Sequence, residues 1–120
     1  MSTILIVDDD DDTRSLIENR LGSIGYQIIT ANDGLDGLGK ARHHKPDFIL
    51  MDMFMPKMDG SDVTRELRML GYTTPIIALT AAVKPADEKI ALDAGCNAVI
   101  VKPIKDNFEE QIAAMIRAYS

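Results

Sequence analysis

The chain has 120 residues, a length that suits one compact domain with a core of its own. Its 13 basic and 19 acidic side chains give a net charge of −6, and the absence of tryptophan and of any lysine or arginine cluster argues against direct nucleic-acid binding. The single cysteine, Cys96, excludes an internal disulfide, and no apolar run is long enough for a signal peptide or a membrane span. We therefore expect a cytoplasmic protein with no membrane partner.

Five short apolar segments have the length and nearly continuous hydrophobicity of parallel strands buried on both faces. In chain order they are Thr3 to Val7, Tyr26 to Thr30, Asp47 to Met51, Pro75 to Leu79 and Ala98 to Val101. The second segment is more mixed in polarity, so we expect it nearer an edge of the sheet.

After each strand, apolar residues recur at the spacing of an amphipathic helix, although Gly37 and Gly39 weaken the second pattern. The residues that mark the five helices are Ile17, Leu21 and Ile24; Leu35, Leu38 and Ala41; Val63, Leu67 and Leu70; Ile90, Leu92 and Ala94; and Phe108, Ile112, Met115 and Tyr119. Strict alternation of strand and helix predicts the α/β class, with a doubly wound parallel sheet and helices on both faces. A single domain over residues 1–120 is expected.

Polar side chains follow four of the predicted strands. Asp8 and Asp9 follow the first, Asp52 the third, Thr80 the fourth and Lys102 the fifth. The carboxyl ends of parallel strands meet at one edge of the sheet, where ligands of such sheets bind. We therefore expect three carboxylates, a hydroxyl and an ammonium group to converge on one site.

Carboxylates this close together repel one another unless a cation joins them. An all-oxygen set of ligands suits Mg²⁺ best, with Mn²⁺ as a second possibility. Because Mg²⁺ commonly binds through one or two carboxylates together with phosphate oxygens, Thr80 and Lys102 are left to contact a phosphoryl group.

Four segments carry a family resemblance: ILIVDDD, ILMDMFMPKMDG, IIALTA and VIVKPI, which together span the chain. In this order and spacing they resemble the signature segments of bacterial two-component response-regulator receiver domains of the chemotaxis (CheY-like) type. The resemblance implies a five-stranded flavodoxin-like sheet in the order 2-1-3-4-5.

The resemblance also implies a role for each site residue. Asp52 would be the phosphoacceptor, and Thr80 and Lys102 would contact the phosphoryl oxygens. The ligands of the metal would be Asp8, Asp9, Asp52 and the backbone carbonyl of Phe54. The bond between Lys102 and Pro103 would be cis.

The function implied is that of a phosphorylation-controlled signalling switch. A histidine kinase or histidine phosphotransfer protein would supply the phosphoryl group, and the modified domain would change its affinity for a downstream protein or a fused output domain. The chain would be a stand-alone or excised receiver that assists its own phosphorylation and dephosphorylation without being a turnover enzyme.

Several residues are better explained by structure than by chemistry. Asp10, Asp11 and Asp12 are expected to cap the first helix, where carboxylates satisfy free backbone N–H groups. His43 and His44 are expected at an exposed helix end. Cys96 is expected to be a small buried residue, and the methionines near Asp52 to pack beneath a loop.

Two positions depart from the receiver pattern. Val99 stands where receivers usually carry an aromatic residue, so the readout of the switch is expected to lie elsewhere, for example in the fourth helix. Phe54 replaces a smaller or polar residue, and its ring could shield an acyl phosphate from water.

Three other functions are the alternatives to this one. A phosphatase of the haloacid-dehalogenase class would need a second aspartate at position 54, which is Phe54 here. A flavodoxin-type cofactor module would need a phosphate-binding loop after the first strand, where the run of aspartates would repel phosphate. A degenerate receiver that acts only as a binding module is the remaining alternative.

Overall fold

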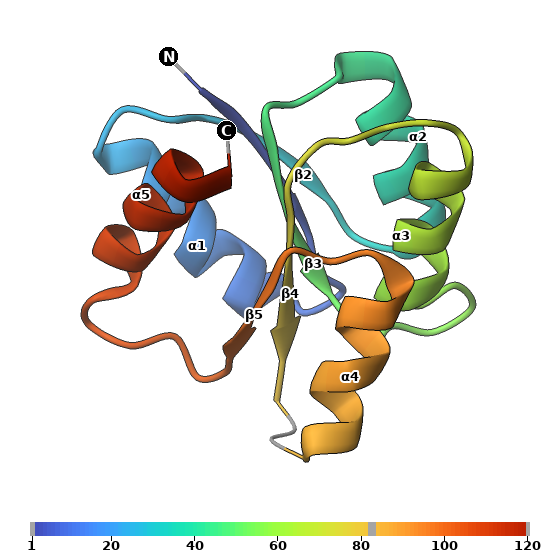
Figure 1. Ribbon diagram of the computed structural model, residues 1–120. Coiled ribbons are helices and arrows are strands. Elements are labelled where there is room, and N and C mark those ends of the chain that lie inside the picture. Colours follow the sequence, from blue (N-terminus) through green and yellow to red (C-terminus); the bar gives the residue numbers. More distant parts are fainter. Residues whose placement is uncertain (1, 82–83, 120) are drawn as a thin grey trace.

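The computed structural model describes residues 2–81 and 84–119, and within them five strands alternate with five helices (Figure 1). The elements are β1 (Thr3–Val7), α1 (Asp11–Ser23), β2 (Gln27–Ala31), α2 (Gly34–His44), β3 (Phe48–Asp52), α3 (Gly60–Met69), β4 (Ile76–Thr80), α4 (Pro85–Ala94), β5 (Ala98–Val101) and α5 (Phe108–Tyr119). No helix in the described part of the chain is both long and apolar enough to cross a membrane.

The strands form one parallel sheet in the order β2-β1-β3-β4-β5, which confirms the expected fold class and strand order. The helices α1 and α5 cover one face, and α2, α3 and α4 cover the other (Figure 1). The strand order reverses at β1, whose two neighbours are β2 and β3. The carboxyl ends of β1 and β3 therefore lie side by side.

Alternate residues of the strands supply two separate cores. Leu5, Val7 and Met51 pack toward α2, α3 and α4, whereas Ile6 and Leu50 pack toward α1 and α5. Because both faces are covered, the central strands need apolar residues at nearly every position. This requirement explains the continuous hydrophobicity of their sequences.

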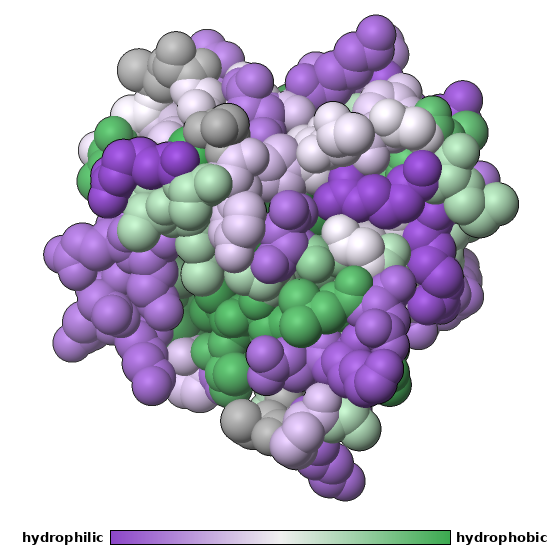
Figure 2. Space-filling model, viewed as in Figure 1, coloured by the Kyte–Doolittle hydropathy of each residue, from purple (hydrophilic) through white to green (hydrophobic). Residues whose placement is uncertain are grey.

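The two edges of the sheet correct one expectation. The strands β2 and β5 lie at the two edges, as the expected order 2-1-3-4-5 requires, but β5 is not buried on both faces as its apolar sequence predicted: of its four residues only Ile100 is buried. Val101 at the end of β5 is 37% exposed. A strand with a neighbour on only one side is covered less completely, which its short apolar sequence does not reveal. Figure 2 shows an apolar area over the region where β5 and α4 lie.

The helices correct the predicted apolar stripes at six positions. Six residues of the predicted stripes are exposed: Ile24, Leu35, Leu70, Ile90, Leu92 and Tyr119. In α4 the predicted Ala94 is buried together with Ala91, whereas Ile90 and Leu92 are exposed. Ile24 and Leu70 are C-cap residues, beyond the last full turn of their helices.

Strand boundaries differ from the prediction by one residue in three cases. The strands β2, β3 and β4 each begin and end one position later than expected. As a result Asp52 and Thr80 are the last residues of β3 and β4 and do not follow them. Both side chains are therefore held by the regular geometry of a strand.

Aspartates begin three of the helices. The side chains of Asp10, Asp33 and Asp59 each accept a hydrogen bond from a backbone N–H in the first turn of α1, α2 and α3. Asp11 and Asp12 lie in the first turn of α1, where a negative charge favours the helix dipole. Capping is thus confirmed for Asp10, and for Asp11 and Asp12 the expected favourable position near the helix dipole is confirmed.

Candidate functional site

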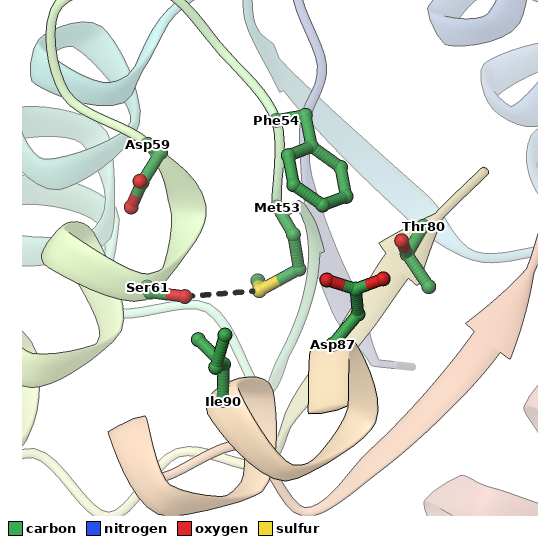
Figure 3. Close-up of a pocket in the computed structure, with 7 residues that line it drawn as sticks. All are labelled: Met53, Phe54, Asp59, Ser61, Thr80, Asp87 and Ile90. Carbon is green, nitrogen blue, oxygen red and sulfur yellow. Dashed lines mark hydrogen bonds between the residues drawn. The ribbon is translucent and has the colours of Figure 1, made fainter. Parts of the chain in front are cut away.

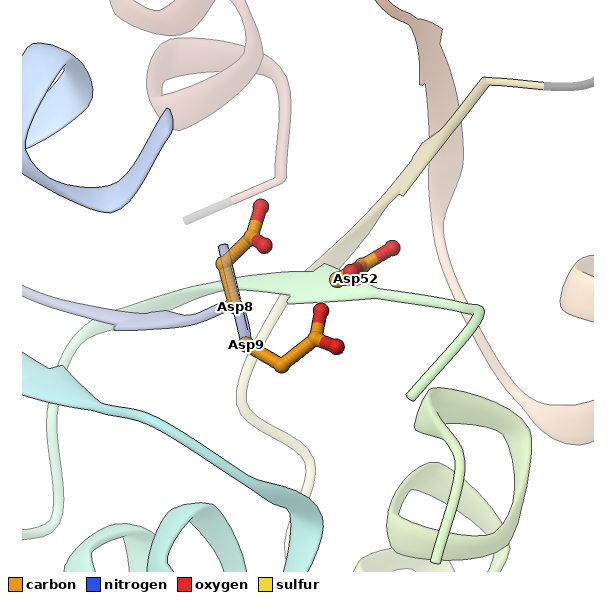
Figure 4. Close-up of side chains that lie close together, drawn as sticks. All are labelled: Asp8, Asp9 and Asp52. Atoms are coloured by element: carbon orange, nitrogen blue, oxygen red, sulfur yellow. The ribbon is translucent and has the colours of Figure 1, made fainter. Parts of the chain in front are cut away.

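The three carboxylates predicted to meet do meet. Asp8 and Asp9 follow β1 and Asp52 ends the adjacent β3, because Val7 pairs with Met51 in the sheet. One oxygen from each carboxylate lies within 4.8 Å of the others (Figure 4). Asp8 and Asp52 are buried, whereas Asp9 is exposed.

Lys102, the residue directly after β5, brings a positive charge to this group. Its Nζ lies 2.8 Å from Oδ2 of Asp8 and 3.6 Å from Oδ2 of Asp52. The backbone N–H of Lys102 donates to the carbonyl oxygen of Thr80, so the residue is anchored to the end of β4. The bond between Lys102 and Pro103 is cis, as the resemblance implied.

Backbone groups hold the two buried carboxylates in place. Oδ1 of Asp8 accepts from the N–H of Asp10 at 2.9 Å, and Oδ1 of Asp52 accepts from the N–H of Phe54 at 3.2 Å. Each carboxylate thus keeps its second oxygen, Oδ2, on the side of Lys102.

Lys102 offsets only part of the repulsion between the carboxylates of Asp8 and Asp52. Burial, and then the charge of Asp8, raise the pKa of Asp52 to about 7, although Lys102 and the N–H of Phe54 act in the opposite direction. Burial would lower the pKa of Lys102, but its hydrogen bond to Asp8 and the charges of Asp52 and Asp8 outweigh that effect and raise it. One ammonium group therefore does not balance the three carboxylates.

The residues present fit a small divalent cation. All three side chains offer oxygen, the donor that Mg²⁺ prefers, and two oxygens bound to one such ion lie roughly 3–4 Å apart. The observed limit of 4.8 Å is close to that spacing. A divalent ion would also relieve the excess negative charge.

The segment after Asp52 passes very close to the site. A Cβ atom on Gly60 would lie only 2.2 Å from the backbone oxygen of Asp52, so the residue at this position must be glycine. Met53 and Met55 are buried beneath the segment, in agreement with their expected packing role. The Phe54 side chain, in contrast, is 55% exposed.

Thr80 is 3% exposed and ends β4, beside the strand that carries Asp52. Val99 on β5 is half-buried and packs against the core beneath α2, α3 and α4. The chain therefore has an aliphatic side chain where the receiver pattern has an aromatic ring.

The remaining expectations concern residues outside the site. His43 and His44 lie exposed in the last turn of α2, with their rings in edge-to-face contact at 4.8 Å. Cys96 is buried, and burial raises the pKa of its thiol. All three agree with the structural roles expected of them.

Sequence reasoning missed Arg14, one helical turn after the N-cap residue Asp10. Its guanidinium donates to the backbone carbonyl of Asp8 at 2.9 Å and also pairs with Asp11. It thereby holds the backbone at Asp8, beside the group of three carboxylates. A basic residue two positions after an acidic block was the signal that could have indicated it.

Comparison with known proteins places this geometry in a family. The model of the response regulator receiver domain matches residues 4–117. The chain belongs to this family, the receiver domains of two-component signalling systems. Membership removes the haloacid-dehalogenase and flavodoxin alternatives, and it makes the domain a signalling module and not a conventional enzyme.

The chain is similar in sequence to segments of sensor histidine kinases and of transcriptional regulators. The sensor histidine kinase RcsC of Salmonella typhimurium is 38% identical over 93% of this chain, and the probable transcriptional regulator ycf27 of Guillardia theta is 39% identical over 95%. The chain spans only 12% of the first protein and 45% of the second.

Two solved structures have the same fold and align with 98–100% of this chain. The chemotaxis protein CheY4 of Vibrio cholerae superimposes with a TM-score of 0.89 and is 30% identical, with 100% of this chain and 99% of that one covered. The receiver domain of sensor histidine kinase PA1611 from Pseudomonas aeruginosa has a TM-score of 0.86 and 34% identity, with 98% and 96% covered. That structure has a magnesium ion coordinated in its active-site cleft.

Proposed function

We propose that residues 1–120 form a single receiver domain that acts as a phosphorylation-controlled switch, with Asp52 as the phosphoacceptor. The observation that supports this most strongly is the buried Asp52 carboxylate, which lies beside Asp8 and Asp9 and 3.6 Å from the ammonium group of Lys102. Phosphoryl transfer depends mainly on positioning and on neutralising charge, and this group of residues can do both.

In the proposed reaction, a carboxylate oxygen of Asp52 attacks the phosphorus of a phosphohistidine. The new O–P bond forms as the N–P bond breaks, and the imidazole leaves with its electron pair. Lys102 offsets negative charge on the transferred group, and the Thr80 hydroxyl donates to one of its oxygens.

A divalent ion would be held by Asp8, Asp9, Asp52 and the backbone carbonyl of Phe54. Mg²⁺ is the expected ion, and Mn²⁺ could replace it. When bound, it would supply positive charge that keeps Asp52 ionised, despite its raised pKa, and that balances the incoming phosphoryl group.

The proposed partners are a histidine kinase or histidine phosphotransfer protein as donor, and a downstream protein or fused output domain as target. The similarity to a segment of a sensor histidine kinase supports the first, and the similarity to a segment of a transcriptional regulator supports the second. The net charge of −6 favours protein partners over nucleic acid.

The test is incubation with Mg²⁺ and phosphoramidate, followed by intact mass measurement. The wild type should gain one phosphoryl group, and Asp52→Asn should gain none. Omission of the metal should abolish the gain, whereas Asp93→Asn, which removes an exposed carboxylate from α4, should leave it unchanged. A wild-type protein that gains no phosphoryl group would support the degenerate receiver instead.

A further inference from the structure

A small cavity opens between the beginnings of α3 and α4, one residue beyond Asp52. It holds about 140 Å³. Figure 3 shows the side chains that line it, which come from the segment after β3, the first turn of α3, the end of β4 and α4. They are Met53, Phe54, Asp59, Ser61, Thr80, Asp87 and Ile90.

The walls of this α3–α4 cavity combine apolar surface with negative charge. Met53, Phe54 and Ile90 supply the apolar part, and the Phe54 ring and Ile90 are 55% and 52% exposed. Asp59 and Asp87 supply the carboxylates. Oδ1 of Asp59 already accepts from the N–H of Asp62, but among the described residues neither carboxylate lies within salt-bridge distance of a lysine or arginine.

The size of the cavity restricts what can fill it. Pockets that enclose small organic ligands usually hold ~300–1,000 Å³. The α3–α4 cavity is well below that range and suits the end of a single side chain. An occupant must therefore arrive on a larger molecule.

The chemistry of the walls favours arginine as that side chain. A guanidinium group can stack on the exposed Phe54 ring and donate two hydrogen bonds to the Asp87 carboxylate. Its aliphatic stem can lie along Ile90 and Met53. An ammonium group lacks the planar shape for the first two contacts together.

We propose that the α3–α4 cavity receives an arginine side chain of the phosphodonor protein and so helps to dock that protein over Asp52. This inference rests on the proposed function. Met53 and Phe54 directly follow Asp52, and Thr80 belongs both to the phosphorylation site and to the cavity wall. A donor that brings its histidine to Asp52 therefore has its neighbouring surface above the cavity.

The cavity is tested first without a partner, by ¹H–¹⁵N NMR titration with ethylguanidinium chloride at constant ionic strength. Wild type should show saturable shifts of the Ser61, Thr80 and Ile90 amides, whereas neutral ethylurea should cause none. Asp87→Asn should lose the response. The matched control Glu88→Gln removes the neighbouring, exposed carboxylate of the same helix and should retain it.

Loss of the response in Asp87→Asn could also follow from a disturbed start of α4. The variant Ile90→Lys is therefore included, because it places a cation at the cavity from an exposed position and should also block the probe. Thermal unfolding of each variant checks that the fold is intact. Shifts that do not saturate, or that persist in both variants, would overturn the proposal.

The second test uses transfer from a purified phosphohistidine protein, chosen from a panel as the donor that transfers fastest to wild type. Asp87→Asn should raise KM by about tenfold at unchanged kcat, the size of one charge-assisted contact, and Glu88→Gln should not. An unchanged KM would overturn docking by the donor. Phosphoramidate labelling of the same variants reports separately on the proposed function, because that small donor makes no use of the cavity.

Discussion

Asp52 is a buried acid in surroundings that disfavour its charge. Burial and the neighbouring Asp8 raise its pKa to about 7, and Lys102 corrects this only in part. An ionised carboxylate in such a site destabilises the folded chain unless a cation offsets its charge.

Replacing Asp52 should therefore stabilise the metal-free protein. In EDTA at pH 8 we expect Asp52→Asn to raise the free energy of unfolding by roughly 1–4 kcal/mol, since each unit of pKa shift corresponds to about 1.4 kcal/mol. A raised pKa in the folded state makes wild type lose stability as the pH rises from about 4 through 7. The advantage of the variant should accordingly shrink as the pH falls and nearly vanish at pH 4.

Urea unfolding at several pH values would measure this difference. Asp93→Asn, which removes an exposed carboxylate, should show no such pH-dependent gain. If Asp52→Asn and wild type had the same free energy of unfolding at pH 8, the charge of Asp52 would not destabilise the fold.

Phe54 is the residue whose side chain most clearly departs from the receiver pattern. Its exposed ring lies beside Thr80 in the α3–α4 cavity and can limit the approach of water to an acyl phosphate (Figure 3). We expect Phe54→Asn to lose its phosphoryl group about tenfold faster, equivalent to about 1.4 kcal/mol in activation free energy. Phe54→Tyr should decay like wild type, and intact mass against time would show both rates. If Phe54→Asn lost its phosphoryl group at the same rate as wild type, Phe54 would have no shielding role.

At the scale of elements, Arg68 links α3, α4 and β5. Its guanidinium donates to the carbonyl oxygens of Tyr72 and Gly95 and to Oδ1 of Asn97. Burial lowers the pKa of Arg68, so these acceptors are needed to compensate for lost water. The amide of Asn97 in turn accepts from the N–H of Ile76 at the start of β4.

Arg68→Ala should therefore destabilise the domain by about 2–3 kcal/mol in urea unfolding, because the carbonyl oxygens of Tyr72 and Gly95 lose their side-chain donor. Among the described residues, Arg65 on the same helix pairs only with the exposed Asp62. Arg65→Ala should change stability by less than about 1 kcal/mol. If the two substitutions lowered the free energy of unfolding equally, the Arg68 hydrogen bonds would stabilise the domain no more than an exposed ion pair does.

At the scale of the whole molecule, the fold gathers much of the negative charge at one edge of the sheet. The acidic block Asp8–Asp12 follows a buried strand, and the sheet adds Asp52 from a distant part of the chain. Binding of a divalent ion to the folded state alone should then raise its stability by mass action.

We expect Mg²⁺ at ten times its Kd to add about 1.4 kcal/mol and to raise Tm by roughly 5 °C. Asp9→Asn should lose this response without misfolding, because Asp9 is exposed. Asp12→Asn makes the same change of charge in the first turn of α1 and should keep the response. Thermal scans with and without Mg²⁺ decide the matter. A full response in Asp9→Asn would exclude it as a ligand.

The sequence alone determined the fold class and most of the site. Continuous apolar strands alternating with amphipathic helices allow few arrangements other than a parallel sheet covered on both faces. In such a sheet the residues at the carboxyl ends of strands must share an edge, so Asp8, Asp9, Asp52, Thr80 and Lys102 were predictable as a group.

Only the tertiary structure decided which apolar residues are covered and what lies next to the site. Periodicity reports the local amphipathic pattern of one helix or strand, but burial depends on which other element packs against it. Ile90 and Val101 are exposed for this reason. The α3–α4 cavity likewise brings Asp59 and Asp87 from separate helices to one space, and no local pattern in either helix records that meeting.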